Sequence, residues 1–299
     1  MDVIKTNEAG KPAKRRNHTV PKAILKNWLL DEEGDPHHLL LACGSAEVRK
    51  HVGREAGFAI TDWRYVPVDD RENAGGHRDE SLEDWFSKGE NYLASVTRKI
   101  RSGDSAISQG EFSGLIGAAV ALGFRSSYEY GLKEKLFLKL KPDLTENEAC
   151  YEVVQYFKTL YEKKISQFEG WDFSFLINSE VKLIIGDRPL FDMTLHRTNT
   201  QLLTIPLAPN LLMVGIPPKT PGKQSFEVIS GTRSLFEQTN AMTTKLAREF
   251  IVGSSVEELS ALLPMFEHEA FNSRKAEDSL VAFSDEGEVA RRKIYNINQ

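Results

Sequence analysis

The hydrophobic pattern of this 299-residue chain changes its period near Gly170. Before that residue, apolar side chains recur every three or four positions, which is typical of amphipathic helices. After it they alternate with polar residues or form short runs between Pro- and Gly-bearing turns, which is typical of strands. The last part returns to helical spacing. This order favours an α+β fold, in which a helical N-terminal half packs on a small, mostly antiparallel sheet and further helices follow at the C-terminus.

Neither half of the chain carries an obvious linker, so we expect two layers of one domain. That domain covers residues 17–265, with the helical layer ending at about residue 169. Residues 1–16 form a basic arm that we expect to be flexible, and residues 266–299 form a charged tail. Seven Lys and Arg residues stand among the first 26. Such an arm either is a solvated terminus or docks on nucleic acid or an acidic partner.

Individual elements follow from the same periods. Two capping boxes, Ser108 with Glu111 and Thr145 with Glu148, mark helix starts. The helix after Ser108 is rich in Gly and Ala, which predicts that another helix packs closely on it. Thr19 is the expected N-cap of the first helix. Helices are expected at residues 19–29, 81–100, 108 to about 125–130, 145–168, 234–251 and 255–263. Strands are expected at 38–42, 171–177, 181–185, 202–205, 211–216 and 226–229, and residues 69–80 read as a loop.

Composition excludes several classes of protein. With 40% hydrophobic residues the chain is too apolar to be disordered, and its net charge of −5 argues against duplex-DNA binding as the main role. The longest apolar run, residues 114–124, is too short for the roughly 20 residues that span a bilayer. The N-terminus has no apolar signal segment, and the chain has only two cysteines, Cys43 and Cys150. We therefore expect a cytoplasmic protein with no membrane partner.

The chain has no GxGxxG, P-loop, GxSxG or HExxH motif. Two residues of the helical half nevertheless stand out. His18 precedes the first helix, where a neutral imidazole can act as a general base or acid; the alternative is that it packs or caps the helix entrance. Glu90 flanks the apolar stripe of its helix, one turn after Phe86. Desolvation there can raise its pKa and make it an acid–base group, or it pairs with basic residues at the surface.

Two further residues end apolar elements. Arg125 follows an almost purely apolar helix, so its charge either snorkels to water or binds a carboxylate or phosphate. Asp187 follows a buried-looking strand in Gly186-Asp187-Arg188-Pro189. Catalytic and metal-binding carboxylates often stand at such strand ends, but Asp and Pro also favour a plain turn.

These motifs carry a resemblance. The opening His18-x-Val20-Pro21-x3-Leu25-x2-Trp28 resembles the start of the bacterial domain-of-unknown-function family DUF4238. Further matches continue to about residue 252: Glu83 and Glu90 in one helix, Arg125, Trp171-x-Phe173, Asp187 and Pro189, Ile205-Pro206-Leu207-Ala208-Pro209, and a helix containing Asn240. The family more often has Ser-Asp-Asn-Pro at residues 186–189, so Asp187 and Pro189 match its pattern, whereas Gly186 and Arg188 depart from it.

The resemblance implies no activity, cofactor or metal, but it implies that His18, Glu90, Arg125 and Asp187 belong together. Our leading hypothesis is a bacterial enzyme, a hydrolase or nuclease, that acts on a phosphate-bearing substrate such as nucleic acid or a nucleotide. In it Arg125 and Asn240 bind substrate, His18 moves protons, and Glu90 and Asp187 serve as acid–base groups or metal ligands. The alternative is a non-catalytic ligand- or partner-binding regulatory protein. A defence or toxin-like effector role is a further guess.

Overall fold

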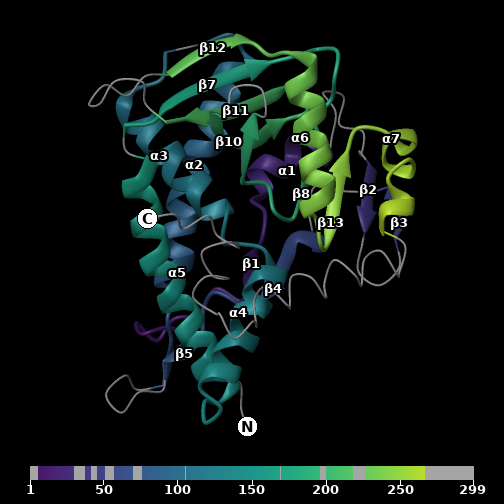
Figure 1. Ribbon diagram of the computed structural model, residues 1–299. Coiled ribbons are helices and arrows are strands. Elements are labelled where there is room, and N and C mark those ends of the chain that lie inside the picture. The colour runs from purple at the N-terminus through teal and green to yellow at the C-terminus, as the bar shows by residue number, and fades with distance from the viewer. Residues whose placement is uncertain are drawn as a thin grey trace. The chain divides into compact units, whose positions relative to one another are not determined.

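The structure is a computed structural model (Figure 1) that describes residues 6–29, 38–41, 46–50, 57–69, 76–104, 106–168, 170–195, 200–217 and 226–266. Its contacts divide the chain into two compact units that interleave along the sequence. Unit 1 comprises Met1–Ala23, Gly57–Arg98 and Ala106–Glu169, and unit 2 comprises Ile24–Ala56, Lys99–Ser105 and Gly170–Gln299. The change of hydrophobic period near Gly170 therefore falls on a boundary between the units. The expectation of one domain over residues 17–265 stays a prediction.

Unit 1 is mainly helical in its described part. Its helices are α2 (Ser81–Arg101), whose last turn enters unit 2, α3 (Gln109–Leu122), α4 (Ser127–Leu140) and α5 (Glu146–Phe168). Two antiparallel strand pairs accompany them: β1 (Arg16–His18) with β4 (Ile60–Asp62), and β5 (Val68–Asp69) with β6 (His77–Arg78). The 3-10 turn η1 (Gly57–Ala59) precedes β4. Both predicted capping boxes are confirmed, at the starts of α3 and α5.

The glycines of α2 and α3 allow close helix packing. A Cβ built on Gly89 of α2 would lie 2.9 Å from the Cα of Ala118 in α3. A Cβ on Gly117 of α3 would lie 2.9 Å from the hydroxyl of Tyr161 in α5. Both distances are too short for a real methyl group, so α3 has helices against it at two glycine positions. The predicted close packing on this Gly- and Ala-rich helix is confirmed.

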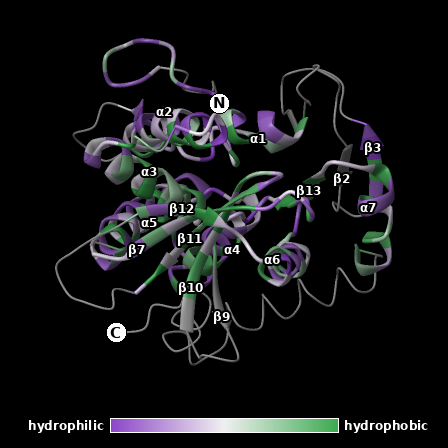
Figure 2. Ribbon diagram, turned by 90° about the horizontal axis from the view of Figure 1, so that it is seen from above, coloured by the Kyte–Doolittle hydropathy of each residue, from purple (hydrophilic) through white to green (hydrophobic). Residues whose placement is uncertain are grey.

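Unit 2 contains two larger sheets. One, in the order β12-β7-β11-β10-β9, is antiparallel except for the parallel pair β12–β7. Its strands are β7 (Asp172–Ile177), β9 (Phe191–Leu195), β10 (Thr200–Ala208), β11 (Leu211–Ile216) and β12 (Phe226–Ser230). Hydrophobic residues predominate on β10 and β11, as the green ribbon in Figure 2 shows, and most of their described side chains are buried.

The other sheet is antiparallel, in the order β3-β2-β13-β8. Its strands are β2 (His38–Leu41), β3 (Glu47–Lys50), β8 (Ile185–Gly186) and β13 (Phe250–Gly253). Helix α6 (Arg233–Leu246) lies between β12 and β13 in sequence, and helix α7 (Val256–Ser260) and the 3-10 turn η2 (Leu263–Phe266) follow β13. Helix α1 (Lys22–Leu29) enters this unit from unit 1. The predicted α+β class with mostly antiparallel sheets is confirmed.

The predicted bounds of one helix and one strand of unit 2 were wrong. The helix expected over residues 234–251 ends at Leu246, and residues 250–253 form β13. The chain leaves the helix because the N–H groups of Arg248 and Glu249 donate to the carboxylate of Asp187 instead of to the helix. The strand expected over residues 181–185 is reduced to β8, because the side chain of Asn240 binds the backbone on both sides of Leu183.

Further differences concern single elements and the connections between them. The helix expected from Ser108 to about residues 125–130 ends at Leu122, and α4 is a separate helix that the pattern did not predict. Strand β9 was also not predicted. Thr19 does not cap α1, which begins at Lys22; its N–H and hydroxyl both donate to the carbonyl of Ala59. Residues 69–80, expected as a loop, include β6. Ala42 and residues 267–299 lie outside the described residues.

The described part of the basic arm contacts acidic residues at the start of α2. The Asn7 amide donates to Glu80 Oε2 at 2.7 Å, and the Lys14 N–H donates to Glu80 Oε1 at 2.6 Å. The Lys14 ammonium pairs with Asp84 at 2.6 Å. Part of the arm's charge is therefore matched within unit 1, which leaves less of it for a nucleic acid or an acidic partner.

Candidate acid–base site

Arg125 is the centre of a buried polar cluster in unit 1. It follows the last turn of α3, and its side chain is 1% exposed. The Nε–H donates to the carbonyl of His18 at 2.9 Å, and Nη1 donates to Glu90 Oε1 at 2.7 Å. The guanidinium carbon lies 4.6 Å from the centre of the Phe86 ring. The arginine predicted to end an apolar helix is therefore buried and held by a carboxylate, rather than extended into solvent.

The backbone of Arg125 is held as firmly as its side chain. The hydroxyl of Tyr65 donates to the Arg125 carbonyl, and the Tyr65 ring packs edge-on against Phe86, 5.5 Å between centroids. The Tyr65 N–H in turn donates to the fully buried Asn17. Since β1, α2 and the residues after β4 all contribute, the guanidinium is fixed in position before any ligand binds.

Two nitrogens of the guanidinium have partners, but the third does not. Arg125 Nη2 is buried and makes no hydrogen bond to any described residue. A buried polar atom without a partner costs about 1–3 kcal/mol, and more when it carries charge. Such atoms are rare in folded proteins, and each calls for an explanation, such as stored strain, a catalytic role or a bound water or ion.

Glu83 contributes a second unpartnered atom to this cluster. It stands seven residues before Glu90, so both carboxyls lie on the same face of α2, two turns apart. Glu83 is 5% exposed, and its Oε2 is buried without a hydrogen-bond partner among the described residues. Burial raises the pKa of the Glu83 carboxyl to about 7, an effect that Arg125 opposes and Glu90 reinforces. Near neutral pH this group is therefore protonated in part of the molecules.

His18 joins the cluster from the end of β1, where it pairs with Ile60 of β4. The side chain is half-buried. Burial lowers the pKa of the imidazole; Glu90 opposes this shift, and Arg125 and two other cations add to it. The imidazole is therefore neutral at pH 7, the form that accepts a proton. Its position precedes α1, as expected, but it is set by strand pairing rather than by the helix N-terminus.

Glu90 is more open to solvent than Arg125 and Glu83. Its side chain is 25% exposed, against 1% for Arg125. One of the two predictions for Glu90 was that it pairs with a basic residue at the surface. It does pair with a basic residue, but this partner, Arg125, is buried. Glu90 therefore balances part of the Arg125 charge and orients the guanidinium.

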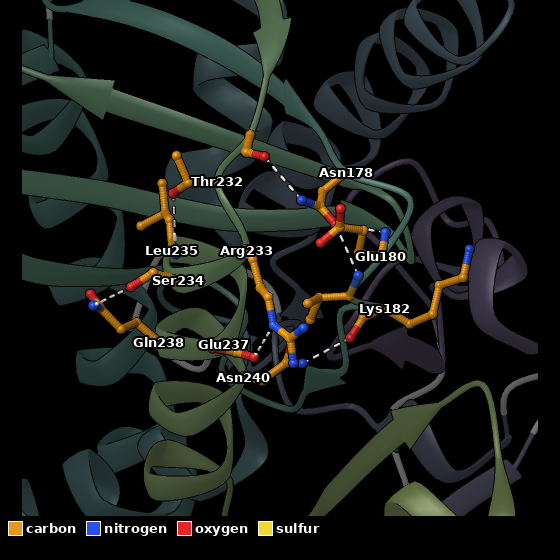
Figure 3. A network of polar contacts seen from close by, with 12 residues as sticks. Asn178, Glu180, Lys182, Thr232, Arg233, Ser234, Leu235, Glu237, Gln238 and Asn240 are labelled. Carbon is orange, nitrogen blue, oxygen red and sulfur yellow. Dashed lines mark hydrogen bonds and ion pairs between the residues drawn. The ribbon is translucent and has the colours of Figure 1, made fainter.

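Asp187 and Asn240 belong to unit 2, and each binds backbone groups of that unit. Asp187 is fully buried, and its Oδ1 accepts the N–H groups of Arg248 at 2.9 Å and Glu249 at 3.2 Å. Asn240 on α6 accepts the N–H of Ile184 at 3.0 Å and donates to the Lys182 carbonyl at 2.8 Å, the second of which Figure 3 shows. These contacts give both side chains a role in shaping the segments around β8.

Asn178 makes similar contacts nearby in the same unit. Its Oδ1 accepts the N–H groups of Glu180 and Val181, and its amide donates to the Gly231 carbonyl at 2.9 Å (Figure 3). Asn178 and Asn240 therefore bind the 178–184 segment at both of its ends. Together they replace the strand pairing that the apolar run from Val181 to Ile185 led us to expect.

The structure brings together His18, Glu90 and Arg125 of the predicted site residues. It adds Glu83, which sequence reasoning did not select as a site residue. The available signal was its seven-residue spacing from Glu90 on one helix, which places both carboxyls beside the same apolar stripe. Among the described residues, no group of three or more His, Cys, Asp or Glu side chains is arranged to hold a metal ion.

A cavity of about 480 Å³ lies elsewhere, in unit 2, beside β7 and β12. It is lined by apolar side chains and by two carboxylates, those of Asp104 and Glu227. None of the predicted site residues lines it. No described helix combines the length and the apolarity that crossing a membrane requires.

The described units define an α+β protein that carries a buried acid–base cluster in its helical unit. The chain belongs to the family described as protein of unknown function (DUF4238), whose model matches residues 16–257. The matched stretch contains every predicted site residue and Glu83. No curated protein and no solved structure matches the chain significantly.

Proposed function

We propose that this protein is an enzyme that hydrolyses a phosphate ester, in a nucleic acid or a nucleotide, at the cluster around Arg125. The observation that carries the proposal is that Nη2 of a buried, fixed guanidinium has no hydrogen-bond partner among the residues that the structure describes. A charged guanidinium nitrogen donates hydrogen bonds to phosphate oxygens, and these bonds are stronger when water is excluded. A donor that is already in position loses little entropy when the phosphate arrives.

The groups around Arg125 suit proton transfer. The neutral imidazole of His18 is the base that takes a proton from the attacking water. Glu90 orients Arg125 through its bond to Nη1, and its partial exposure makes it the side of the cluster that substrate approaches. Catalytic action of Asp187 and substrate binding by Asn240 stay predictions. In the structure both side chains bind backbone groups of unit 2.

The test is turnover of several phosphate esters by the full chain. The substrates are bis(p-nitrophenyl) phosphate, single-stranded RNA and DNA, and nucleoside triphosphates, each with Mg²⁺, with Mn²⁺ and with EDTA. The variants are Arg125→Lys, which keeps the charge but loses the Nη2 donor, and His18→Ala. We expect each to lower kcat/KM by about 100-fold or more.

A matched control comes from α6. Arg233 and Glu237 form an exposed pair with an N–O distance of 2.8 Å, close to that of the Arg125–Glu90 pair. Arg233→Lys should leave turnover unchanged, and thermal melts should show that all variants fold. Absence of turnover with every substrate would overturn the proposal. If inorganic phosphate then still bound the wild type but not Arg125→Lys, the alternative of a non-catalytic ligand-binding protein would be favoured.

A further inference from the structure

The unpartnered atoms of Glu83 and Arg125 belong to the same cluster, and they do not bond each other. Nη2 is a donor, and Oε2 is a donor only when Glu83 is protonated. Oxygen atoms of a ligand can accept a hydrogen bond from either group. A phosphate ester carries several such oxygens, so it could satisfy both buried groups that the described protein leaves unsatisfied.

Charged groups from several elements face Glu83. Arg125 and Lys14 favour its ionised form, whereas Glu90 and Asp84 favour the protonated form. Burial outweighs the two cations, because an ionised Oε2 without a hydrogen bond would be a buried charge with little compensation. His18 experiences the opposite effect of the same burial, since desolvation favours its neutral form. The cluster therefore holds one group that can release a proton and one that can accept it.

We propose that Glu83 is the catalytic acid of the site and protonates the leaving oxygen of the phosphate ester bound at Arg125. This inference rests on the proposed phosphate-ester hydrolysis. Water attacks phosphorus while His18 takes one of its protons. The bond from phosphorus to the leaving oxygen breaks, its electron pair stays on that oxygen, and the proton of Glu83 Oε2 is transferred to it. Exchange with solvent then returns a proton to Glu83 and removes one from His18, so the net reaction is ester plus water to alcohol plus phosphate.

The first experiment compares leaving groups. An acid matters most when the leaving oxygen is strongly basic, so Glu83→Gln should lower turnover of a phenyl phosphodiester by about 100-fold or more. Turnover of the p-nitrophenyl diester should fall by less than about 10-fold, because that leaving group departs without a proton. Glu83→Asp, which retains a carboxyl, should recover part of the phenyl activity. Equal losses on both substrates would mean that Glu83 only supports the structure, and would overturn the proposal.

The second experiment does not depend on turnover. Carbon-13 NMR of glutamate-labelled protein, with Glu83→Gln to assign the resonance, follows the carboxyl of Glu83 in the full chain. We expect its titration centred near 7. Titration in the ordinary range of glutamate would overturn the proposal whatever the activity. If Glu83 titrates near 7 but no ester is turned over, the proposed function fails and the acid role with it. Glu152→Gln on α5, where Glu152 pairs with Lys141 at the surface, is the control and should change neither result.

Discussion

Replacing Glu83 by Gln should make the protein more stable at alkaline pH. The folded state raises the pKa of Glu83 from 4.5 to about 7, so it binds this proton more tightly than the unfolded chain does. For an acid whose pKa is raised by folding, the associated stability is complete below the unfolded pKa and is lost as pH rises through the folded pKa. A difference of this size corresponds to about 3 kcal/mol when fully developed. Gln has nearly the same shape as protonated Glu and cannot ionise.

The assay is urea denaturation of wild type and Glu83→Gln at pH 5 and pH 8.5. Titrating groups that do not interact with Glu83, His18 among them, contribute equally to both proteins and cancel in the difference between them. The free energy of unfolding of the variant, relative to wild type, should therefore rise by about 2–3 kcal/mol between the two pH values. The free energy of unfolding of Glu152→Gln should change with pH as that of the wild type does. If Glu83→Gln also showed the wild-type pH dependence, Glu83 would have an ordinary pKa, and the description of a desolvated acid would be refuted.

Further predictions concern packing and backbone contacts. Gly89→Ala should lower the free energy of unfolding by about 1–3 kcal/mol, since its methyl group would lie 2.9 Å from the backbone of α3. Gly110→Ala, where the methyl meets open space, should raise the free energy of unfolding by about 0.5–1 kcal/mol. If urea titrations showed both glycine variants changing this free energy in the same direction, the packing argument would be contradicted. Asn240→Ala should lower the free energy of unfolding by about 1–3 kcal/mol, because it leaves a backbone N–H unpaired. An unchanged melting temperature would argue against this structural role of Asn240. Asp187→Ala removes the acceptor of two N–H groups and should lower the free energy of unfolding by about 2–5 kcal/mol. A wild-type melting temperature together with lost turnover would instead favour the catalytic role.

The local signals in the sequence predicted most of the helical unit. The two capping boxes mark the starts of α3 and α5, and the apolar period predicted α2 to within one residue of its end. These signals succeed because a helix closes its hydrogen bonds within a few residues. Arg125 was found for a related reason: a charge that ends a long apolar helix must have a partner or reach water.

The errors lie where distant residues decide the structure. Phe250 continues the helical spacing of Met242 and Leu246, yet it belongs to β13, which pairs with β2 and β8. A three-to-four-residue period cannot reveal that pairing. Similarly, the apolar run from Val181 resembles a strand, but Asn240, far along the chain, takes its backbone groups.

Glu83 was missed as a site residue for the same reason. On its own helix it is one of several acidic residues in the first turns, and its spacing from Glu90 only places it on the same face. Its pKa depends on burial and on charges from other parts of unit 1, including Arg125 and Lys14. Sequence spacing therefore predicts which carboxyls are neighbours, whereas the tertiary structure determines which of them loses its water.

The energetic cost of the cluster is itself an argument for a ligand. The folded protein loses about 3 kcal/mol of stability when Glu83 ionises. Buried atoms without a partner among the described residues, such as Glu83 Oε2 and Arg125 Nη2, each cost about 1–3 kcal/mol. Gln at position 83 would avoid the cost of ionisation, and an apolar side chain would avoid the unpaired oxygen as well. Sites that depart from the most stable local solution are where function is expected. Ligand oxygens that accept hydrogen bonds from these atoms would offset the costs. Glu83 can donate such a bond only in its protonated form, so ligand binding at this site depends on the same proton that the stability measurement detects.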